Sequence, residues 1–375
     1  MDFFIHTFEA VTWQSVVMMG VGGLLIYLAV IKEFEPNLLL PMGFGTILVN
    51  LPLSSALDQM AGGKLIEGAL SMFFKLGIAS EILPLLILIA VGAMCDFTPL
   101  LANPKVFLFG LTAQMGIFLT MGLALFFGYN VYEAASIGII GAADGPTSIY
   151  VSTRFAPNLL GPISVAAYTY MALVPLIQPP VIMALTTQNE RRMKMPYADR
   201  PVSHRALVLF PIFITMVGGI IAPASVSLLG FVMFGNLLRV SGVTDRLSNA
   251  AQNELANIVT ILLGFSIAAT MTGEKFVNMN TLVIIAMGLV AFVLDTAGGV
   301  LTAKLLNLFL PKAQRINPMI GAAGISAFPM SARTIQRLGQ KADPTNHLLM
   351  HAVGANVAGQ IGSVLAGGAL LAYLG

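Results

Sequence analysis

The sequence predicts an all-α integral membrane protein with about eleven transmembrane or re-entrant helices. Three observations lead to this fold class. Hydrophobic residues make up 57% of the 375 residues and charged residues only 10%, whereas an ordinary soluble domain has about 25% charged residues. Long apolar stretches recur along the chain, and a helix of about 20 such residues crosses a bilayer. The short alternating strands of a membrane barrel are missing, so no sheet is expected.

The predicted segments differ in their continuity. Residues 12–31 and 106–128 are continuous, whereas 38–53 contains Pro41 and Gly43, and 82–101 is interrupted by Pro84, Asp96 and Pro99. The remaining segments, in chain order, are 134–151, 159–186, 206–223, 224–240, 258–271, 281–303, 318–332 and 348–374. Two of them, 134–151 and 318–332, contain internal Gly and Pro residues that break a helix. We expect these two to be broken or re-entrant helices.

Charge and composition limit the possible functions. A net charge of +2 and a single cysteine, Cys95, argue against a nucleic-acid partner and exclude an internal disulfide. The first ten residues carry no Lys or Arg, so we expect no cleavable signal peptide. Basic residues gather in 187–205, which includes Arg200, and again at Lys304, Lys312 and Arg315. Because positive loops stay cytoplasmic, we place both clusters on the inner side of the membrane.

An internal repeat relates the two broken segments. The letters IGAA occur at residues 140–143 and again at 320–323, each time with an Arg thirteen or fourteen positions later. We infer two repeat halves, approximately 82–186 and 258–375, joined by 187–257, within a single membrane domain. Paired interrupted segments in two halves indicate a midplane site in transporters, and whether the two repeats are inverted depends on the number of spans between them.

Asp144 most strongly indicates a transport function. A carboxylate inside a span costs at least ~2.5–3.5 kcal/mol on insertion scales, so a cation, a proton or a basic side chain must compensate it. Gly145 and Pro146 follow directly, and such an interruption frees carbonyls that suit a hard cation such as Na⁺. The alternative is an Asp that caps a helix starting at Pro146. Both interpretations can hold together.

The second break carries neutral oxygen ligands. Asn317 and Ser326 supply side-chain oxygens, and Pro329 exposes a carbonyl by removing a backbone donor. Together with Asp144, these groups could surround a monovalent cation. The alternative is close helix packing through the small residues of this stretch, which is common in membranes.

Other polar residues have two possible roles. Arg333 could clamp an anionic carboxylate or be an interfacial Arg whose head reaches water, and Arg154 has the same ambiguity. Tyr170 is a possible proton carrier, although a packing phenol is the plainer interpretation. Further candidates are Tyr168 in the same helix, Gln178 as a cavity residue, Asp96 as a helix cap, and Asp295 and Asn356 without an assigned role. No nucleotide or metal-ligand motif is evident.

Several motifs resemble the membrane β subunit of the sodium-pumping biotin-dependent decarboxylases. They are GAADGPT (141–147), AAYTYMALVPLIQPP (166–180) and GISAFPM (324–330), supported by EFEPNLLLPMGFG (33–45), VGAMCDFTPLLANP (91–104) and LDTAGGVLTAK (294–304). The resemblance covers the chain from about residue 33 to the C-terminus. It implies a subunit that decarboxylates carboxybiotin, takes up a proton from the outer side and exports Na⁺.

The resemblance also implies a site and a complex. By motif, Asp144 matches the essential intramembrane acid of the family, and the other functional positions match Tyr170, Asn317, Gly321, Ser326 and Arg333. Asp144, Asn317, Gly321 and Ser326 would hold Na⁺, Tyr170 would share its exchange with a proton, and Arg333 would orient carboxybiotin. The implied partners are a biotin carrier subunit, a soluble carboxyltransferase (α) subunit, a small membrane-anchoring subunit and two further copies in a homotrimer. The resemblance further implies an inverted repeat, with a core of broken helices packed against a scaffold, and a location in the bacterial inner membrane.

Two other functions compete with this interpretation. A stand-alone Na⁺/H⁺ or Na⁺/carboxylate transporter would use the same broken helices and the same acid. A purely structural anchor for soluble enzymes would not need the polar breaks. The acid that supplies CO₂ belongs to another chain; oxaloacetate, methylmalonyl-CoA, glutaconyl-CoA and malonate are candidates, and the compact chain slightly favours an acyl-CoA.

Overall fold

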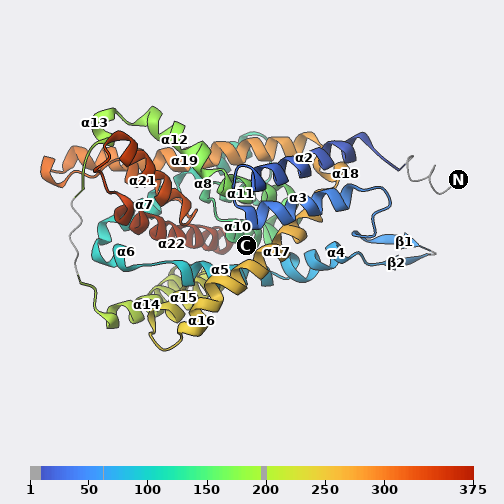
Figure 1. Ribbon diagram of the computed structural model, residues 1–375, viewed down its shortest axis with the longest axis horizontal. Helices are drawn as coiled ribbons and strands as arrows, with labels where there is room; N and C mark the ends of the chain where they lie inside the picture. Colours follow the sequence, from blue (N-terminus) through green and yellow to red (C-terminus); the bar gives the residue numbers. More distant parts are fainter. Residues whose placement is uncertain (1–9, 62, 196–200) are drawn as a thin grey trace.

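The computed structural model describes residues 10–61, 63–195 and 201–375, and almost every element in these ranges is a helix (Figure 1). Six of these helices are long and apolar enough to cross a membrane, or eight if each of two bent pairs is one span. The all-α membrane fold is therefore confirmed, while the count of about eleven segments stays a prediction. Arg200 of the basic segment lies outside the described residues.

The N-terminal region begins with two closely packed helices. Thr12 caps the first of them by accepting a hydrogen bond from the backbone of Ser15 (3.1 Å). A Cβ added at Gly22 would lie 2.7 Å from the carbonyl oxygen of Gly43, so only glycine allows the two backbones to approach this closely. The elements are α2 (Trp13–Val30), α3 (Pro36–Asn50), β1 (Gln59–Ala61), β2 (Lys64–Ile66), α4 (Ala69–Phe73), η1 (Phe74–Ala79), α5 (Ile82–Met94) and α6 (Thr98–Ala102).

The middle of the chain contains the first break. Asn130 and Glu133 form a capping box at the start of α9, and a short 3₁₀ turn follows before the chain restarts as α10. The elements are η2 (Pro104–Val106), α7 (Phe107–Thr112), α8 (Met115–Phe126), α9 (Val131–Gly138), η3 (Ile139–Ala142), α10 (Gly145–Phe155), η4 (Pro157–Leu159), α11 (Leu160–Ala172), α12 (Val174–Leu185) and α13 (Gln188–Arg191).

The last part of the chain contains the longest helices and the second break. The elements of this part are α14 (His204–Ile221), η5 (Pro223–Ser225), α15 (Val226–Val240), α16 (Asp245–Ala250), η6 (Ala251–Leu255), α17 (Ala256–Ala268), α18 (Gly273–Phe276), α19 (Met279–Phe309), η7 (Lys312–Gln314), α20 (Met319–Ala322), α21 (Met330–Ala342) and α22 (Leu349–Leu374). The long helix α19 packs against α8, η3, α11, α12 and α20, so it contacts the elements on which both breaks lie.

One sequence expectation is wrong in detail. A small antiparallel hairpin, β1–β2, exists where no sheet was expected, because Gly63, with φ +76°, makes a tight turn. The stretch predicted to be continuous at 106–128 lies in one apolar span, Pro104–Phe126, and its α-helical pattern is interrupted only at Ala113 and Gln114. The side chain of Gln114 donates back to the carbonyl of Gly110 (3.0 Å), which competes with regular helix bonding.

The apolar segment 159–186, which contains Pro175, Pro179 and Pro180, is not one straight helix. This segment forms α11 and α12, which are bent by 70° relative to each other. Helix α4 and π-helix η1, which the sequence did not predict, form a second such pair with α5, bent by 62°.

The two basic clusters lie at the same end of the molecule. In Figure 1, α13 and the end of α19 lie together at the left, opposite the β1–β2 hairpin. Lys304 of α19 forms an ion pair with Glu190 of α13 (3.2 Å). This arrangement agrees with placing both clusters on one side of the membrane.

Candidate functional site

The first break places a carboxylate at the start of a buried helix. The turn η3 ends at Ala142, and the φ of +52° at the next residue, Ala143, directs the chain away from the helix axis. Asp144 then caps α10, and its Oδ1 accepts a hydrogen bond from the backbone N–H of Thr147 (3.1 Å). The cap that we weighed as an alternative is therefore present, and it puts the acid at the positive end of the α10 dipole.

The carboxylate of Asp144 is held by hydroxyl groups. Its Oδ2 accepts hydrogen bonds from Oγ1 of Thr147 (2.7 Å) and from Oγ of Ser363 on α22 (2.7 Å). Asp144 is only 4% exposed, and no ion pair to it is present among the described residues. Three neutral donors thus solvate the group but leave its charge without a basic partner.

The second break lies against the first. Between α20 and α21, the backbone N–H and the hydroxyl of Ser326 both donate to the carbonyl oxygen of Ala142 (3.1 and 2.6 Å). Ala142 is two positions before Asp144. The structure therefore brings together the two interrupted segments, which are far apart in the sequence.

Helix α22 holds both breaks through one polar stripe. Asn356 donates to the carbonyl of Ile325 (2.6 Å), and the Gln360 side chain donates to the carbonyl of Ser326. Ser363 completes the stripe at Asp144. Residues spaced by four and three lie on one helix face, so this spacing was the available signal, yet sequence analysis named only Asn356.

Asn317 and Gly321 occupy supporting positions in this arrangement. The side-chain amide of Asn317 donates to the carbonyls of Arg191 (3.1 Å) and Met193 (2.8 Å), which fixes the basic segment after α13. A Cβ added at Gly321 would lie 1.9 Å from the carbonyl oxygen of Gly299, so this glycine permits α20 and α19 to touch through their backbones. No hydrogen bond from either residue to Asp144 or Ser326 occurs in the described part of the chain.

The two candidate tyrosines face different neighbours. The Tyr170 hydroxyl donates to the carbonyl of Ile285 on α19. Tyr168 instead lies over the start of α10, because a Cβ added at Gly145 would meet its ring at 2.4 Å. The hydroxyl of Tyr168 is buried and has no hydrogen-bond partner among the described residues. Thus the phenol packed beside Asp144 is Tyr168, although the sequence favoured Tyr170.

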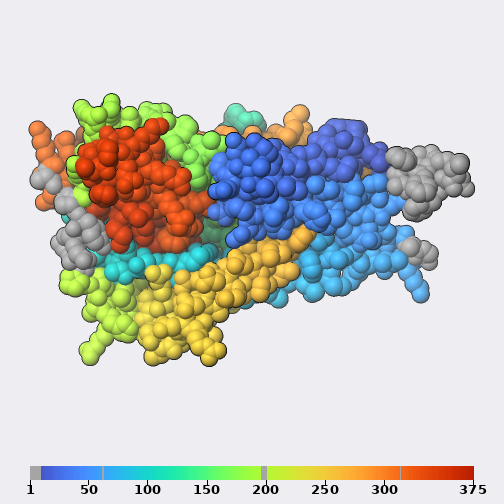
Figure 2. Space-filling view, viewed as in Figure 1, coloured from blue at the N-terminus to red at the C-terminus, as the bar shows by residue number. Residues whose placement is uncertain are grey.

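Gln178 and the two arginines complete the predicted set. Gln178 donates to the carbonyl of Ala322 (2.8 Å) and accepts from the Ser331 hydroxyl (3.0 Å), so it joins α12 to the second break. Arg333 is exposed on α21, close enough to Glu35 for the two charges to interact. In Figure 2, α21 (red) lies beside the N-terminal helices (blue) on the face shown.

Arg154 and Asp96 have structural roles. Arg154 pairs with Glu81 (3.1 Å) and donates to the Tyr150 hydroxyl (2.9 Å). Asp96 accepts from the backbone of Thr98 (2.9 Å), as a helix cap does. Neither residue contacts the breaks through these bonds.

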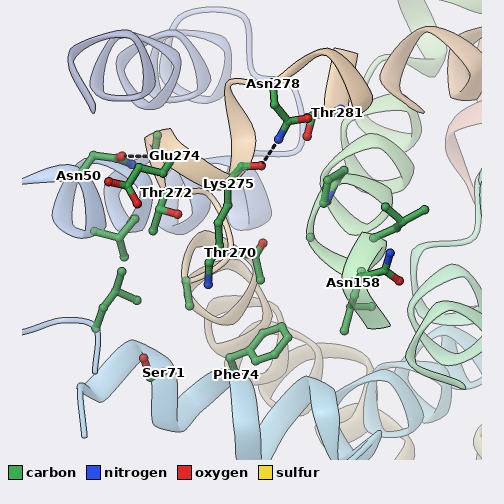
Figure 3. Close-up of a pocket in the computed structure, with 18 of the residues that line it drawn as sticks. Asn50, Ser71, Phe74, Asn158, Thr270, Thr272, Glu274, Lys275, Asn278 and Thr281 are labelled. Atoms are coloured by element: carbon green, nitrogen blue, oxygen red, sulfur yellow. Dashed lines mark hydrogen bonds between the residues drawn. The ribbon is translucent and has the colours of Figure 1, made fainter. Parts of the chain in front are cut away.

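A large polar cavity lies apart from the breaks. It has a volume of about 980 Å³ and is lined by side chains of α2, α3, η1, α18 and the start of α19. Figure 3 shows Asn50, Thr272, Glu274 and Lys275 on one side and Asn158 on the other. Nearby, hydrogen bonding from Lys75 (2.9 Å) lowers the pKa of Asp58. Asp144, Ser326 and Arg333 do not line this cavity.

The donor set at the breaks suits a small hard cation. Asp144 offers a carboxylate, Ser326 and Ser363 offer hydroxyls, and the interrupted backbone offers carbonyls; these are the oxygen ligands that such cations prefer. Two buried oxygens nearby, Oδ1 of Asn356 and Oε1 of Gln114, have no hydrogen-bond donor in the part of the chain that the structure describes. Buried acceptors without donors are costly, and a cation among them would remove that cost.

Comparison with known proteins identifies relatives over almost the whole chain. Residues 14–374 match the family described as the Na⁺-transporting oxaloacetate decarboxylase beta subunit. The chain is 50% identical to the glutaconyl-CoA decarboxylase subunit beta of Acidaminococcus fermentans, over 98% of this chain and 95% of the relative. It is 50% identical to the methylmalonyl-CoA decarboxylase subunit beta of Veillonella parvula, with the same coverage. It is 45% identical to the oxaloacetate decarboxylase beta chain 2 of Salmonella typhimurium, over 96% of this chain and 94% of the relative.

Proposed function

This chain belongs to the β-subunit family of the Na⁺-transporting decarboxylases, and from that premise we propose that it couples the decarboxylation of carboxybiotin to Na⁺ export and proton uptake. It is a decarboxylase subunit with several apolar membrane helices. The finer steps that follow are argued from the contacts at the two breaks.

The observation that carries the proposal is the contact between the two breaks. Asp144 contributes a carboxylate that is 4% exposed, and Ser326 of the second break bonds to Ala142 just before it. A buried carboxylate without a basic partner needs a proton or a cation for neutrality. We therefore assign Asp144 and Ser326 to the Na⁺ site, with the backbone carbonyls of both breaks completing it.

Asn317 and Gly321 are proposed to complete the Na⁺ site when the core rearranges. In the described arrangement, Asn317 holds the segment after α13 and Gly321 contacts Gly299. Both therefore link the second break to elements outside it. Movement of α20 along α19 would change the oxygens presented to the cation, which is how a two-state core could alternate access.

Proton exchange is assigned to Asp144 and Tyr170. Entry of Na⁺ favours deprotonation of a neighbouring acid, and its departure favours reprotonation. The Tyr170 hydroxyl contacts α19 at Ile285, so it can transmit movement of that helix to the break. Because the coupling between the two cations is reciprocal, proton uptake also promotes Na⁺ release.

Arg333 is assigned to the anionic end of carboxybiotin. Its side chain is exposed and forms no ion pair among the described residues, so its guanidinium is available to bind a carboxylate with two parallel bonds. Loss of CO₂ leaves negative charge on the ureido nitrogen of biotin, and a proton must arrive there. Arg333 would orient the anion while the proton reaches it.

The complex and its substrate are also proposals. We infer a biotin carrier, a carboxyltransferase α subunit, a small membrane-anchoring subunit and a homotrimer of this chain in the bacterial inner membrane. The relatives include subunits named for glutaconyl-CoA, methylmalonyl-CoA and oxaloacetate. The 50% identity to the two acyl-CoA subunits, against 45% for the oxaloacetate subunit, favours an acyl-CoA.

The test measures Na⁺-dependent CO₂ release and ²²Na⁺ transport by the purified complex in vesicles. Asp144→Asn is expected to reduce both about 100-fold, since loss of a charged contact worth ~3 kcal/mol corresponds to that factor. Ser326→Ala is expected to raise the Na⁺ concentration for half-maximal rate about tenfold. Asp96→Asn is the matched control and should leave Na⁺ dependence unchanged.

Two outcomes would oppose the proposal. Equal activity of Asp144→Asn and Asp96→Asn would remove the acid from the mechanism. Na⁺/H⁺ exchange by this chain alone, with no CO₂ release when carboxybiotin is supplied, would favour the stand-alone transporter.

A further inference from the structure

A second carboxyl group lies near the two breaks. Asp295, in the middle of α19, is 0% exposed, and neither of its carboxyl oxygens makes a hydrogen bond of normal geometry. The hydroxyl of the adjacent Thr296 is also buried without a partner. Three buried oxygens at one depth of α19 therefore lack a hydrogen bond of normal geometry among the described residues, which is costly for a merely structural position.

The carboxyl group fills a space made by two glycines. A Cβ at Gly116, at the start of α8, would lie 2.3 Å from Oδ1 of Asp295, and a Cβ at Gly141, in η3, would lie 2.5 Å from Oδ2. The backbone amides of Gly116 and Ile117 face the carboxyl group. One oxygen thus points to the positive end of a helix, and the other points to the segment that leads to Asp144.

The same face of α19 reaches the second break. Gly299 lies one helical turn after Asp295, and its backbone touches Gly321 of α20. Asp295 therefore lies between the contact of α19 with η3 and its contact with α20. A change in the position of either break relative to α19 would alter the surroundings of this carboxyl group.

An ionised Asp295 would be expensive in the described arrangement. No Lys, Arg or His of the described residues forms an ion pair with it, and a charged group inside a membrane segment needs a partner. The amides at the start of α8 offer only partial positive charge. A bound proton, or a bound monovalent cation, makes the group neutral.

We propose that Asp295 is a second cation-exchanging carboxyl group of the transport core, which binds either a proton or Na⁺. The carboxylic acid releases its proton as the carboxylate takes Na⁺, so the exchange leaves the net charge of the site unchanged. This inference rests on the proposed function, because it adds a second site to a Na⁺-transporting core centred on Asp144.

Equilibrium binding of ²²Na⁺ to the complete detergent-solubilised complex tests the proposal without relying on turnover. The parent complex is expected to bind two Na⁺ per β chain through these carboxyl groups. Asp144→Asn and Asp295→Asn should each retain one. Asp96→Asn is the control and should bind like the parent.

A second measurement covers the case in which Asp295→Asn fails to assemble. In the parent complex, dicyclohexylcarbodiimide is expected to modify Asp295, and saturating Na⁺ should suppress the modification several-fold, as read by peptide mass spectrometry. Modification that is independent of Na⁺, or none at any pH, would overturn the second site. So would complete loss of Na⁺ binding in Asp144→Asn. If Asp144→Asn still binds two Na⁺, the proposed function fails, whatever the result at Asp295.

Discussion

The break between η3 and α10 and the break between α20 and α21 differ in length, in charge and in what holds them. The first consists of Ala143 and Asp144, and its acid caps the helix that follows. The second runs from residue 323 to 329 and contains no charged residue. The first break supplies charge and the second supplies backbone oxygens.

The supports of the two breaks differ in the same way. Hydroxyl groups of Thr147 and Ser363 surround the acid of the first break. Amide side chains of Gln178, Asn356 and Gln360 hold carbonyls in and beside the second break. Hydroxyls can turn to meet either a carboxylate or a cation, whereas amides hold a backbone in one position. We therefore expect the first break to respond to the ion and the second to define its cavity.

Replacing one glycine beside each break gives the largest predicted difference in stability between the two breaks. In Gly321→Ala the new Cβ would lie 1.9 Å from the backbone carbonyl of Gly299, whereas in Gly145→Ala it would lie 2.4 Å from the ring of Tyr168. A ring can tilt but two packed helices cannot separate cheaply, so we expect ~3 kcal/mol or more of destabilisation for Gly321→Ala and ~1–2 kcal/mol for Gly145→Ala. Thermal denaturation of the purified complex measures both.

Gly122→Ala is the matched control for these two variants. A Cβ at Gly122 meets nothing within 4 Å, so this variant should match the parent or gain about 0.5 kcal/mol through a less flexible unfolded chain. Equal destabilisation by Gly321→Ala and Gly145→Ala would show that the two breaks are supported in the same way.

Two substitutions on α22 separate ion binding from support. Ser363→Ala removes a donor to the carboxylate of Asp144, so the Na⁺ concentration for half-maximal decarboxylation should change about tenfold while stability changes little. Gln360→Leu removes the bond to the carbonyl of Ser326, so it should lower stability by ~1–2 kcal/mol. Ser266→Ala, which removes a buried hydroxyl without a partner, is the control; if it shifts the Na⁺ dependence as much as Ser363→Ala, the effect is not specific to the acid.

The sequence predicted the chemistry of the breaks better than their contacts. An acid followed by Gly and Pro inside an apolar stretch is unusual enough to identify Asp144 without structural information. The same argument could not identify Ser363 and Gln360, because single polar residues in a long helix also serve packing. Their spacing with Asn356 places the three residues on one face of α22, but spacing alone does not tell whether that face points to the breaks or to another helix.

The two tyrosines show the same limit of sequence-based prediction, here for two residues of one helix. Residues 168 and 170 are two positions apart on α11, so they differ by about 200° around the helix axis and point to opposite sides. Family motifs favoured Tyr170, but rotation of α11 places Tyr168 over Gly145. The short interruption of the α-helical pattern at Ala113 and Gln114 lies inside one apolar span, and one buried Gln with two nearby glycines gives no sequence signal for it.

Removing the phenolic hydroxyl of Tyr170 or of Tyr168 is predicted to have a smaller effect than the substitutions above. Tyr170→Phe loses the bond to Ile285 of α19, which should cost ~1 kcal/mol and slow decarboxylation several-fold if this phenol carries protons. Tyr168→Phe loses a hydroxyl that has no partner, so its stability should equal or slightly exceed that of the parent. Thermal denaturation and the pH dependence of the decarboxylation rate measure these effects. If Tyr168→Phe loses more proton-dependent activity than Tyr170→Phe, the proton carrier is Tyr168, beside the first break.

The smallest predicted effect lies at the far end of α21, where the second broken helix meets the basic segment. Hydrogen bonds from Thr345 (2.7 and 2.9 Å) and the ammonium group of Lys194 (3.2 Å) lower the pKa of Asp343 to about 2. Because the pKa is lower in the folded state than the ordinary value of about 3.9, this carboxylate stabilises the fold above about pH 4. The stabilisation is lost as the pH falls towards 2.

Asp343→Asn should therefore melt slightly below the parent at pH 7, and the two melting curves should converge by about pH 2. Exposed Glu67, which pairs with Lys75 near the hairpin (2.9 Å), provides the control Glu67→Gln. If the melting difference of Asp343→Asn stays constant with pH, the end of α21 is held by packing, and the contrast between charged and neutral support does not extend beyond the breaks.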